Sequence, residues 1–440
     1  MGVLKKCKPR KEILSDELSD ALFAADFGQV VDNQGAKVYR DPKQFFQTTH
    51  LTIQLKKTTT EIFKILANKQ SDGTIFRLST GFGGGKTHAL IALYHLGKNI
   101  GDGSLGLELL PAAGRPSEVN VVAIDAAKAG FPEFSSKNNT HSFHAEVFYR
   151  LGGKEALKLL GKNDGYDSSP DTALIEKAFP KGPTLILIDE LVVYLAKAMA
   201  KNAGGNVLGF LRQLATVVSS RKQAVLVITD PANQVSYMNQ AQAVDQLLAS
   251  AAQNLGDESN RWSTDRDPIG KESAQVIARR LFEKIDSTEA QRISAEYHKL
   301  HERIKEEHPE LVENHLFSGD YAKLIVENYP FHPRLVDAAK NRVSLIPEFN
   351  QTRGVLRLFG RIIRDIWDAK NDLNLIGEGD INWESDQIQS DLIQRLNRDS
   401  FRASIEADVV RHAQELDQGG KTAVHQRVAR ALLFESLPLD

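Results

Sequence analysis

Short apolar runs alternate with amphipathic stretches over the first 270 residues of the chain. Four runs are typical of buried strands: TIFRLS (74–79), VNVVAID (119–125), PTLILIDE (183–190) and AVLVITD (224–230). Helical patterns lie between them, such as HALIALYHL and NVLGFLRQLATVV. Strands that alternate with helices predict a parallel sheet with helices on both faces. The sequence therefore predicts an α/β core over residues 46–270, preceded by an N-terminal arm over residues 1–45.

A helical pattern replaces the strand pattern from about residue 270. Four amphipathic helices are predicted, in KESAQVIARRLFEKI, AEYHKLHERIKEEH, PRLVDAAKNRVSLI and RGVLRLFGRIIRDIW. We expect an all-α lid domain over residues 271–372, then an acidic linker and the helical start of a further region over residues 373–440. The apolar face of the last segment, ARALLFESLPLD, has nothing after it to pack on. We therefore expect this region to be truncated and the chain to be part of a longer protein.

Composition and charge exclude several classes of protein without selecting one. With 440 residues, 41% hydrophobic and 25% charged, neither wholesale disorder nor a fibrous repeat is expected. The net charge of -2 gives no overall basic field, so any contact with nucleic acid would need a local patch. A basic run near the N-terminus could contact phosphates, although a solvated tail is the more ordinary interpretation. The run consists of Lys5, Lys6, Lys8, Arg10 and Lys11.

The single cysteine, Cys7, cannot form an internal disulfide and excludes a Cys-based zinc site. No apolar signal-peptide core follows the basic N-terminus, and no stretch approaches the roughly 20 apolar residues of a membrane span. We therefore expect a cytoplasmic protein that does not engage a membrane.

Residues 80–87, TGFGGGKT, match a phosphate-binding loop except at the first position. The general pattern is G-x-x-x-x-G-K-[ST], and Thr80 stands where the first glycine belongs. The glycines would let backbone N–H groups converge on an anion, Lys86 would reach the outer phosphates, and the Thr87 hydroxyl would bind Mg²⁺. A glycine-rich turn is the alternative, and His88 is ordinarily a packed or capping residue. The residues expected to contact the nucleotide are Thr80, Gly81, Phe82, Gly83, Gly84, Gly85, Lys86, Thr87 and His88.

An acid pair follows the apolar strand LILI about 100 residues after the loop. Asp189 is predicted to hold Mg²⁺, and Glu190 to orient or deprotonate the attacking water. In ATPases of the AAA+ type a polar residue at the end of the next strand contacts that water and the γ-phosphate. Thr229 is the candidate for this role, ahead of Asp230, and a simple turn is the alternative. Asp125 also ends a strand, and we interpret it as a structural cap.

Arginines that could stabilise transition-state charge follow the acid pair. Arg353 in TRGVLR is the candidate for contacting the nucleotide from the helical lid. A surface or interhelical ion pair is the alternative for every arginine considered. The other candidates are Arg261, Arg266, Arg279, Arg280 and Arg357.

Several strings resemble a family of AAA+-type P-loop ATP-binding proteins of the domain-of-unknown-function 499 type. They are FAADFGQVV, FFQTTHLT, LSTGFGGGKTHALIALYHL, LILIDELVVYL, RRLF, YPFHPRLV and FNQTRGVLRLFG. Members of this bacterial and archaeal family also tend to have Thr at the opening loop position, and they are typically longer than this chain. They are encoded near DNA methyltransferases, helicases and nucleases in anti-phage defence islands. The resemblance implies that Lys86, Thr87, Asp189 and Glu190 bind nucleotide and Mg²⁺, and that Arg353 is the lid arginine.

Two functional classes remain open from the sequence. In the first, a homo-oligomeric ATPase couples ATP hydrolysis to the remodelling of DNA or of a partner defence protein. In the second, ATP binding is a slow switch that holds an interaction scaffold on or off, with little turnover. A small-molecule kinase is disfavoured because the acid pair resembles that of a hydrolase. We expect the first class, with ATP and Mg²⁺ as cofactors and Glu190, Lys86, Thr229 and Arg353 as the catalytic residues.

Overall fold

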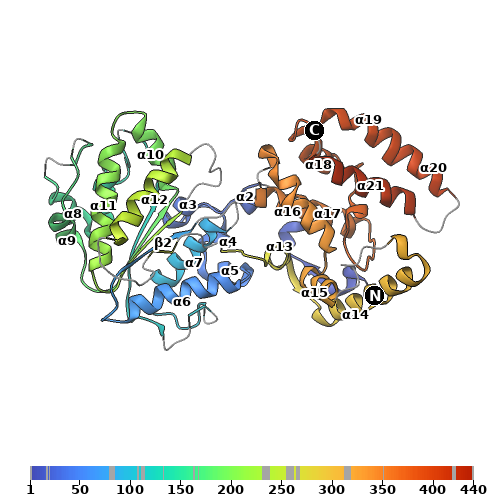
Figure 1. The fold of residues 1–440 in the computed structure, drawn as a ribbon, viewed down its shortest axis with the longest axis horizontal. Coiled ribbons are helices and arrows are strands. Elements are labelled where there is room, and N and C mark those ends of the chain that lie inside the picture. The colour runs from blue at the N-terminus through green and yellow to red at the C-terminus, as the bar shows by residue number, and fades with distance from the viewer. Residues whose placement is uncertain are drawn as a thin grey trace. The chain divides into compact units, whose positions relative to one another are not determined.

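The computed structural model folds into two compact units (Figure 1). Unit 1 comprises Met1–Ala24, Thr48–His50 and Lys271–Asp440, and unit 2 comprises Ala25–Gln47 and Leu51–Gly270. The structure describes residues 2–15, 18, 20–78, 85–106, 109–110, 114–131, 133–161, 164–166, 168–229, 238–253, 262–263, 268–311, 319–349, 351–418 and 423–438.

Unit 2 is built on a parallel β-sheet with the strand order β3-β4-β5-β2-β6. The strands are β2 (Thr74–Leu78), β3 (Asn120–Asp125), β4 (Thr184–Asp189), β5 (Ala224–Thr229) and the two-residue β6 (Trp262–Ser263). The α/β class and the parallel sheet predicted from the sequence are therefore confirmed. Because the order is not sequential, β5 lies between β2 and β4.

Helices cover both faces of this sheet, as Figure 1 shows. One face packs on α8 (Phe143–Lys158), α9 (Thr172–Ala178), α10 (Leu191–Met199), α11 (Gly204–Ser220) and α12 (Met238–Gln253). The other packs on α3 (Phe27–Val31), α4 (Lys37–Arg40), α5 (Pro42–Thr48), α6 (Ile53–Ala67) and α7 (Lys86–Lys98).

The alternation of side chains along each strand decides which face its last residue occupies. In β4, Ile186 and Ile188 belong to the hydrophobic cluster of α8–α12, whereas Leu185 and Leu187 belong to that of α3–α7. Asp189, two residues after Leu187, is therefore directed to the face that α7 covers. The same period places Asp125 and Thr229 on this face. The three polar strand ends thus share one face and one edge of the sheet.

Unit 1 is mainly helical. Its helices are α1 (Val3–Lys6), α2 (Asp20–Phe23), α13 (Ser273–Leu281), α14 (Ser287–Glu307), α15 (Gly319–Asn328), α16 (Pro333–Asn341), α17 (Gln351–Asp368), α18 (Asp386–Gln389), α19 (Arg402–Ser404), α20 (Ala413–Asp417) and α21 (Val424–Ser436). None of the helices in the described part of the chain is long and apolar enough to cross a membrane.

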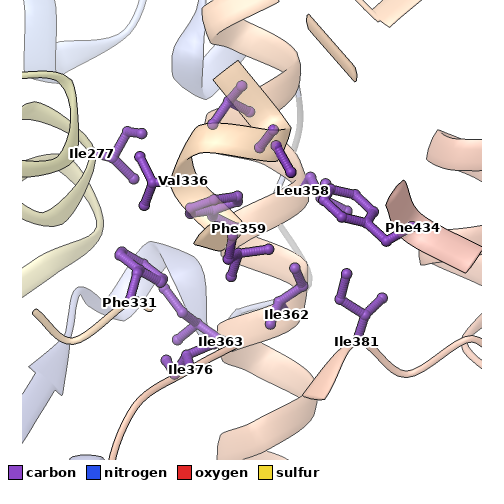
Figure 2. Close-up of a cluster of buried hydrophobic side chains, with 14 of the residues drawn as sticks. Ile277, Phe331, Val336, Leu358, Phe359, Ile362, Ile363, Ile376, Ile381 and Phe434 are labelled. Atoms are coloured by element: carbon purple, nitrogen blue, oxygen red, sulfur yellow. The ribbon is translucent and has the colours of Figure 1, made fainter. Parts of the chain in front are cut away.

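Helix α17 is the centre of the unit 1 core (Figure 2). Phe359 and Ile363 point toward Phe331 and Ile376, whereas Leu358 and Ile362 point toward Ile381 and Phe434 on the opposite side. Segments 271–372 and 373–440 therefore share one hydrophobic core. This differs from the expected separation of a lid from a further region, because a helix with apolar residues on two sides needs partners from both segments.

The N-terminal segment is divided between the two units. Cys7–Pro9 forms β1, which pairs antiparallel with β7 (Phe282–Ile285) in unit 1, and Ala25–Gln47 belongs to unit 2. The interpretation of the basic N-terminal run as a solvated tail is therefore wrong. Cys7 has an exposed fraction of only 5%, so its burial against unit 1 fixes the strand.

Candidate functional site

The candidate site lies at the carboxyl edge of the sheet in unit 2. In parallel sheets the carboxyl ends of the strands meet at one edge, where ligands commonly bind. Leu78 at the end of β2 pairs with Thr229 of β5, and Asp125 of β3 pairs with Asp189 of β4. Because β5 separates β2 from β4, Thr229 lies between Leu78 at the end of β2 and Asp189 at the end of β4.

Asp189 stands at the centre of a hydrogen-bonded cluster of two threonines and one aspartate. Its side chain is 4% exposed, and its Oδ1 accepts a hydrogen bond from the Thr229 hydroxyl. The side chain of Thr87, in the first turn of α7, also hydrogen-bonds to Asp189. We call Thr87, Asp189 and Thr229 the Thr–Asp–Thr cluster. It joins three parts of the chain that the sequence analysis assigned to one site.

Burial raises the pKa of Asp189 from 3.8 to about 7. The negative charges of Glu190 and Asp125 act in the same direction, while the hydrogen bonds from Thr229 and Thr87 oppose it. Among the described residues, the hydrogen bonds from Thr229 and Thr87 therefore offset only part of the cost of burying this carboxylate. Perturbed carboxyl groups of this kind occur frequently at functional sites.

Helix α7 begins at Lys86, directly after Gly85. Gly85 has φ +88°, a left-handed conformation that favours glycine, and an added Cβ would lie 2.9 Å from Cγ1 of Ile269. Lys86 is only 6% exposed. A cation in the first turn is disfavoured by the helix dipole, which attracts anions to that end. The start of α7 is thus suited to an anionic ligand that also meets the lysine.

Glu190 occupies a strained turn between β4 and α10. It has φ +51° and ψ +40°, in the left-handed region that non-glycine residues seldom adopt. Its backbone N–H donates a 3.1 Å hydrogen bond to Oγ1 of Thr229. The Thr229 hydroxyl therefore accepts from the backbone of Glu190 and donates to the carboxylate of Asp189. This bridging role, which the sequence analysis did not assign to Thr229, fixes the two acids relative to each other.

Asp125 has a structural role at the neighbouring strand end. Its Oδ2 accepts a hydrogen bond from the backbone N–H of Gly28 at 3.3 Å, and Lys128 lies 3.7 Å from the same oxygen. Lys128 also forms an ion pair with Asp26, the residue that caps α3. Asp125 thus holds α3 against β3, in agreement with the structural interpretation of this residue.

The remaining candidate residues are not part of the Thr–Asp–Thr cluster. The ring of His88 packs on Phe45 with a centroid distance of 4.4 Å, as the packed interpretation predicts. Arg357 in unit 1 is buried and donates to Asp391 at 2.8 Å, so the alternative of an ion pair holds there. Arg353 lies exposed in the first turn of α17 in unit 1, and its role stays a prediction. Several candidates lie outside the described residues: Thr80, Gly81, Phe82, Gly83, Gly84, Asp230, Arg261 and Arg266.

Arg279 and Arg280 lie in the last turn of α13 in unit 1. The Arg280 guanidinium donates to the backbone oxygen of Leu22 and lies 5.6 Å from the centroid of the Phe23 ring. Arg280 is therefore a packing residue of unit 1, whereas the side chain of Arg279 is exposed.

Fold and site together define a parallel α/β protein with a hydroxyl–carboxylate cluster at the carboxyl edge of its sheet. A family model described as the DUF499 N-terminal domain matches residues 1–252, and one described as the DUF499 second domain matches residues 269–440. The chain therefore belongs to the DUF499 family, whose function is uncharacterised. Neither a curated protein nor a solved structure matches the chain.

Proposed function

We propose that the chain binds ATP together with Mg²⁺ and hydrolyses it, as a P-loop ATPase of the AAA+ type. The observation that carries this proposal is the hydrogen bond between Thr87 and Asp189. It brings the hydroxyl that ends the phosphate-loop motif against the carboxyl group that ends the apolar strand β4. These two residues lie about 100 positions apart in the sequence, and a chance glycine run would give no reason for them to meet.

The side chains of the site suit both the Mg²⁺ ion and the phosphates of ATP. Carboxylate and hydroxyl oxygens are the ligands that Mg²⁺ prefers, and Thr87 and Asp189 would hold it. A bound cation would also compensate the buried Asp189 carboxylate, whose pKa lies near 7 without one. Lys86 and the N-terminus of α7 would bind the phosphates. When bound, Mg²⁺ would neutralise charge on the phosphate oxygens.

The strand order supports the same class. Strand β5 lies between β2 and β4, and its last residue, Thr229, is the polar strand end expected in ATPases of the AAA+ type one βα unit after the acid pair. Thr229 then acts as a positioning residue, since its hydroxyl bridges the Asp189 carboxylate and the backbone of Glu190.

Glu190 is the proposed general base, which would accept a proton from the attacking water at its carboxylate. Its left-handed backbone conformation supports this role, because strained residues cluster at functional sites. From the family resemblance alone, we further propose a cytoplasmic, homo-oligomeric protein. Its ATP turnover would remodel DNA or a partner protein in anti-phage defence.

The test is the steady-state ATPase rate of the full chain, measured across protein concentration with and without duplex DNA. Glu190→Gln should bind ATP and leave it unhydrolysed. Lys86→Ala should lose most ATP affinity, because it removes the positive charge that would contact the outer phosphates. Glu155→Gln is the matched control, since this carboxylate is exposed on α8 and pairs only with Lys158 among the described residues. Binding is followed separately with a fluorescent ATP analogue.

The outcomes separate the two functional classes. A rate that Glu190→Gln abolishes and Glu155→Gln preserves supports the hydrolase. Turnover by Glu190→Gln at the wild-type rate would overturn the assignment of the base. Tight ATP binding by the wild type, with negligible turnover at every protein concentration and with DNA, would instead indicate the slow switch.

A further inference from the structure

The two-stranded ribbon of β1 and β7 in unit 1 gathers basic side chains from distant parts of the sequence. Lys8 lies directly opposite Lys284 in the antiparallel register. After β1, the backbone N–H of Arg10 donates to the backbone oxygen of Leu281 at 3.0 Å, which continues the pairing. The segment that precedes β7 in the sequence, the end of α13, contributes Arg279. The ribbon thus places the basic N-terminal run beside a second basic segment.

Specific contacts hold this group together. The Arg10 guanidinium donates to the backbone oxygen of Arg279 at 3.0 Å from Nη2 and 3.4 Å from Nε. Lys8 forms a 2.8 Å ion pair with Glu283. The hydrogen bond from Lys8, followed by the charges of Lys8, Arg10 and Lys11, lowers the pKa of Glu283. We define the basic ribbon as Lys8, Arg10, Lys11, Arg279 and Lys284.

The basic ribbon carries more positive charge than its neighbouring carboxylates offset. Glu283 is bonded to Lys8, and Glu12 acts on Arg10, which also feels the like charges of Arg279 and Arg280. Like charges directly opposite in an antiparallel pair, as in Lys8 and Lys284, are destabilising. Among the residues that the structure describes, none forms an ion pair with Lys11, Arg279 or Lys284, although all three are exposed. Apart from the Lys8–Glu283 ion pair and the hydrogen bonds of Arg10, this concentration of like charge does not stabilise the fold, and an anionic ligand would neutralise it.

We propose that the basic ribbon binds the phosphate backbone of double-stranded nucleic acid without reading its sequence. Lysine and arginine side chains bind nucleic acid by neutralising its phosphates and releasing their counterions, and such contacts carry no sequence information. No ATP is needed for this contact, so it is independent of the proposed hydrolysis.

Two other anionic partners fit less well. A membrane surface would require apolar anchors beside the charges. In the described residues 2–14 and 273–286, Leu14 is the one large hydrophobic side chain that is exposed. Single-stranded nucleic acid would require exposed aromatic rings on which bases stack. The aromatic residue of these ranges, Phe282, is buried.

The test is fluorescence anisotropy of labelled duplexes of two unrelated sequences with the full chain, without nucleotide, across salt concentration. The variant combines Lys11→Gln, Arg279→Gln and Lys284→Gln, at the three ribbon residues that form no ion pair with the described residues. The matched control combines Lys299→Gln, Arg303→Gln and Lys370→Gln, exposed residues of the same unit with the same change in net charge. Circular dichroism and thermal unfolding verify that both variants fold.

We expect the wild type to bind both duplexes equally, with an affinity that falls steeply with salt. Each lost phosphate contact lowers the slope of log affinity against log salt by about 0.9, so the ribbon variant should lose about 2 to 3 in slope. At low salt it should bind at least about tenfold more weakly, and the control should bind as the wild type does. Lys86→Ala should also bind duplex normally, which keeps this proposal separate from ATP binding.

Four results with nucleic acid would overturn the proposal. These are no duplex binding by the wild type, an unchanged salt slope in the ribbon variant, an equal loss in the control variant, and tighter binding to single-stranded DNA. Phosphatidylserine vesicles supply the membrane comparison. Binding to the vesicles that exceeds binding to duplex, and that depends on the same three residues, would assign the ribbon to a membrane surface instead.

Discussion

Replacement of Asp189 by Asn should stabilise unit 2 in the absence of metal, increasingly so as the pH rises. The pKa of Asp189 rises from 3.8 to about 7 on folding, chiefly because the carboxyl group is buried. Between these two values the native protein binds the proton and the unfolded chain does not. Raising the pH through this interval therefore removes stability from the wild type. Asn has no proton to lose, and its side-chain oxygen can still accept from Thr229.

The magnitude follows from the pKa difference. The stability gained by Asp189→Asn should grow by about 1.4 kcal/mol for each pH unit between about pH 4 and about pH 7, then level off near 4 kcal/mol. Urea unfolding in EDTA, followed by pulsed hydrogen exchange on peptides from β4 and β5, reports on unit 2 separately from unit 1. Glu155→Gln is the control and should show no such slope.

A stability difference between wild type and Asp189→Asn that does not change with pH would refute this reasoning. It would mean that Asp189 is ionised throughout, and that a charge on the protein already compensates it. The Thr–Asp–Thr cluster would then be a completed structural unit, and the argument that it needs a cation would fail.

Three further changes test other parts of the structure. Glu190→Gly should raise the stability of unit 2 by about 1 kcal/mol, because glycine relieves the left-handed strain, and should abolish ATP turnover; unchanged stability in urea would contradict the strain argument. Gly85→Ala should destabilise unit 2 by about 1 to 2 kcal/mol in the same assay, because the left-handed backbone and the nearby Cγ1 of Ile269 both disfavour a Cβ at this position. Adding Ile269→Ala should recover only the part of this loss that comes from the contact with Ile269. Asp391→Ala should cost unit 1 about 3 to 5 kcal/mol by urea unfolding, since its buried carboxylate pairs with both Arg357 and Arg361, and adding Arg357→Met should recover part of this loss; equal loss in single and double variants would contradict a buried-charge penalty.

Local pattern was enough to predict the sheet of unit 2 and the acid pair. The apolar runs could be recognised as strands because β4 and β5 are buried on both faces, and a strand of this kind has a nearly continuous run of apolar residues. The alternation of side chains along β4 also predicts which face of the sheet Asp189 occupies, since Asp189 lies two residues after Leu187. The hydrogen bonds of Thr229 could not be read in this way, because they depend on which strand lies beside β4.

Unit 1 was harder to predict because its contacts are distant in the sequence. An amphipathic pattern shows that α17 has apolar sides, but not that Phe434 covers one of them. The three-residue strand β1 contains Pro9 and pairs with residues about 270 positions away, so neither its length nor its composition signals a strand. The basic N-terminal run was misread for this reason.

The burial of Cys7 has a practical consequence. It is the single cysteine of the chain, it is 5% exposed, and burial raises its pKa to about 11, so little thiolate exists near neutral pH. Cysteines introduced at exposed positions such as Lys201 in unit 2 and Lys370 in unit 1 would therefore be the reactive thiols of the protein. Spin labels or fluorophores can then report the distance between the two units, with and without nucleotide, in a chain that keeps its native cysteine.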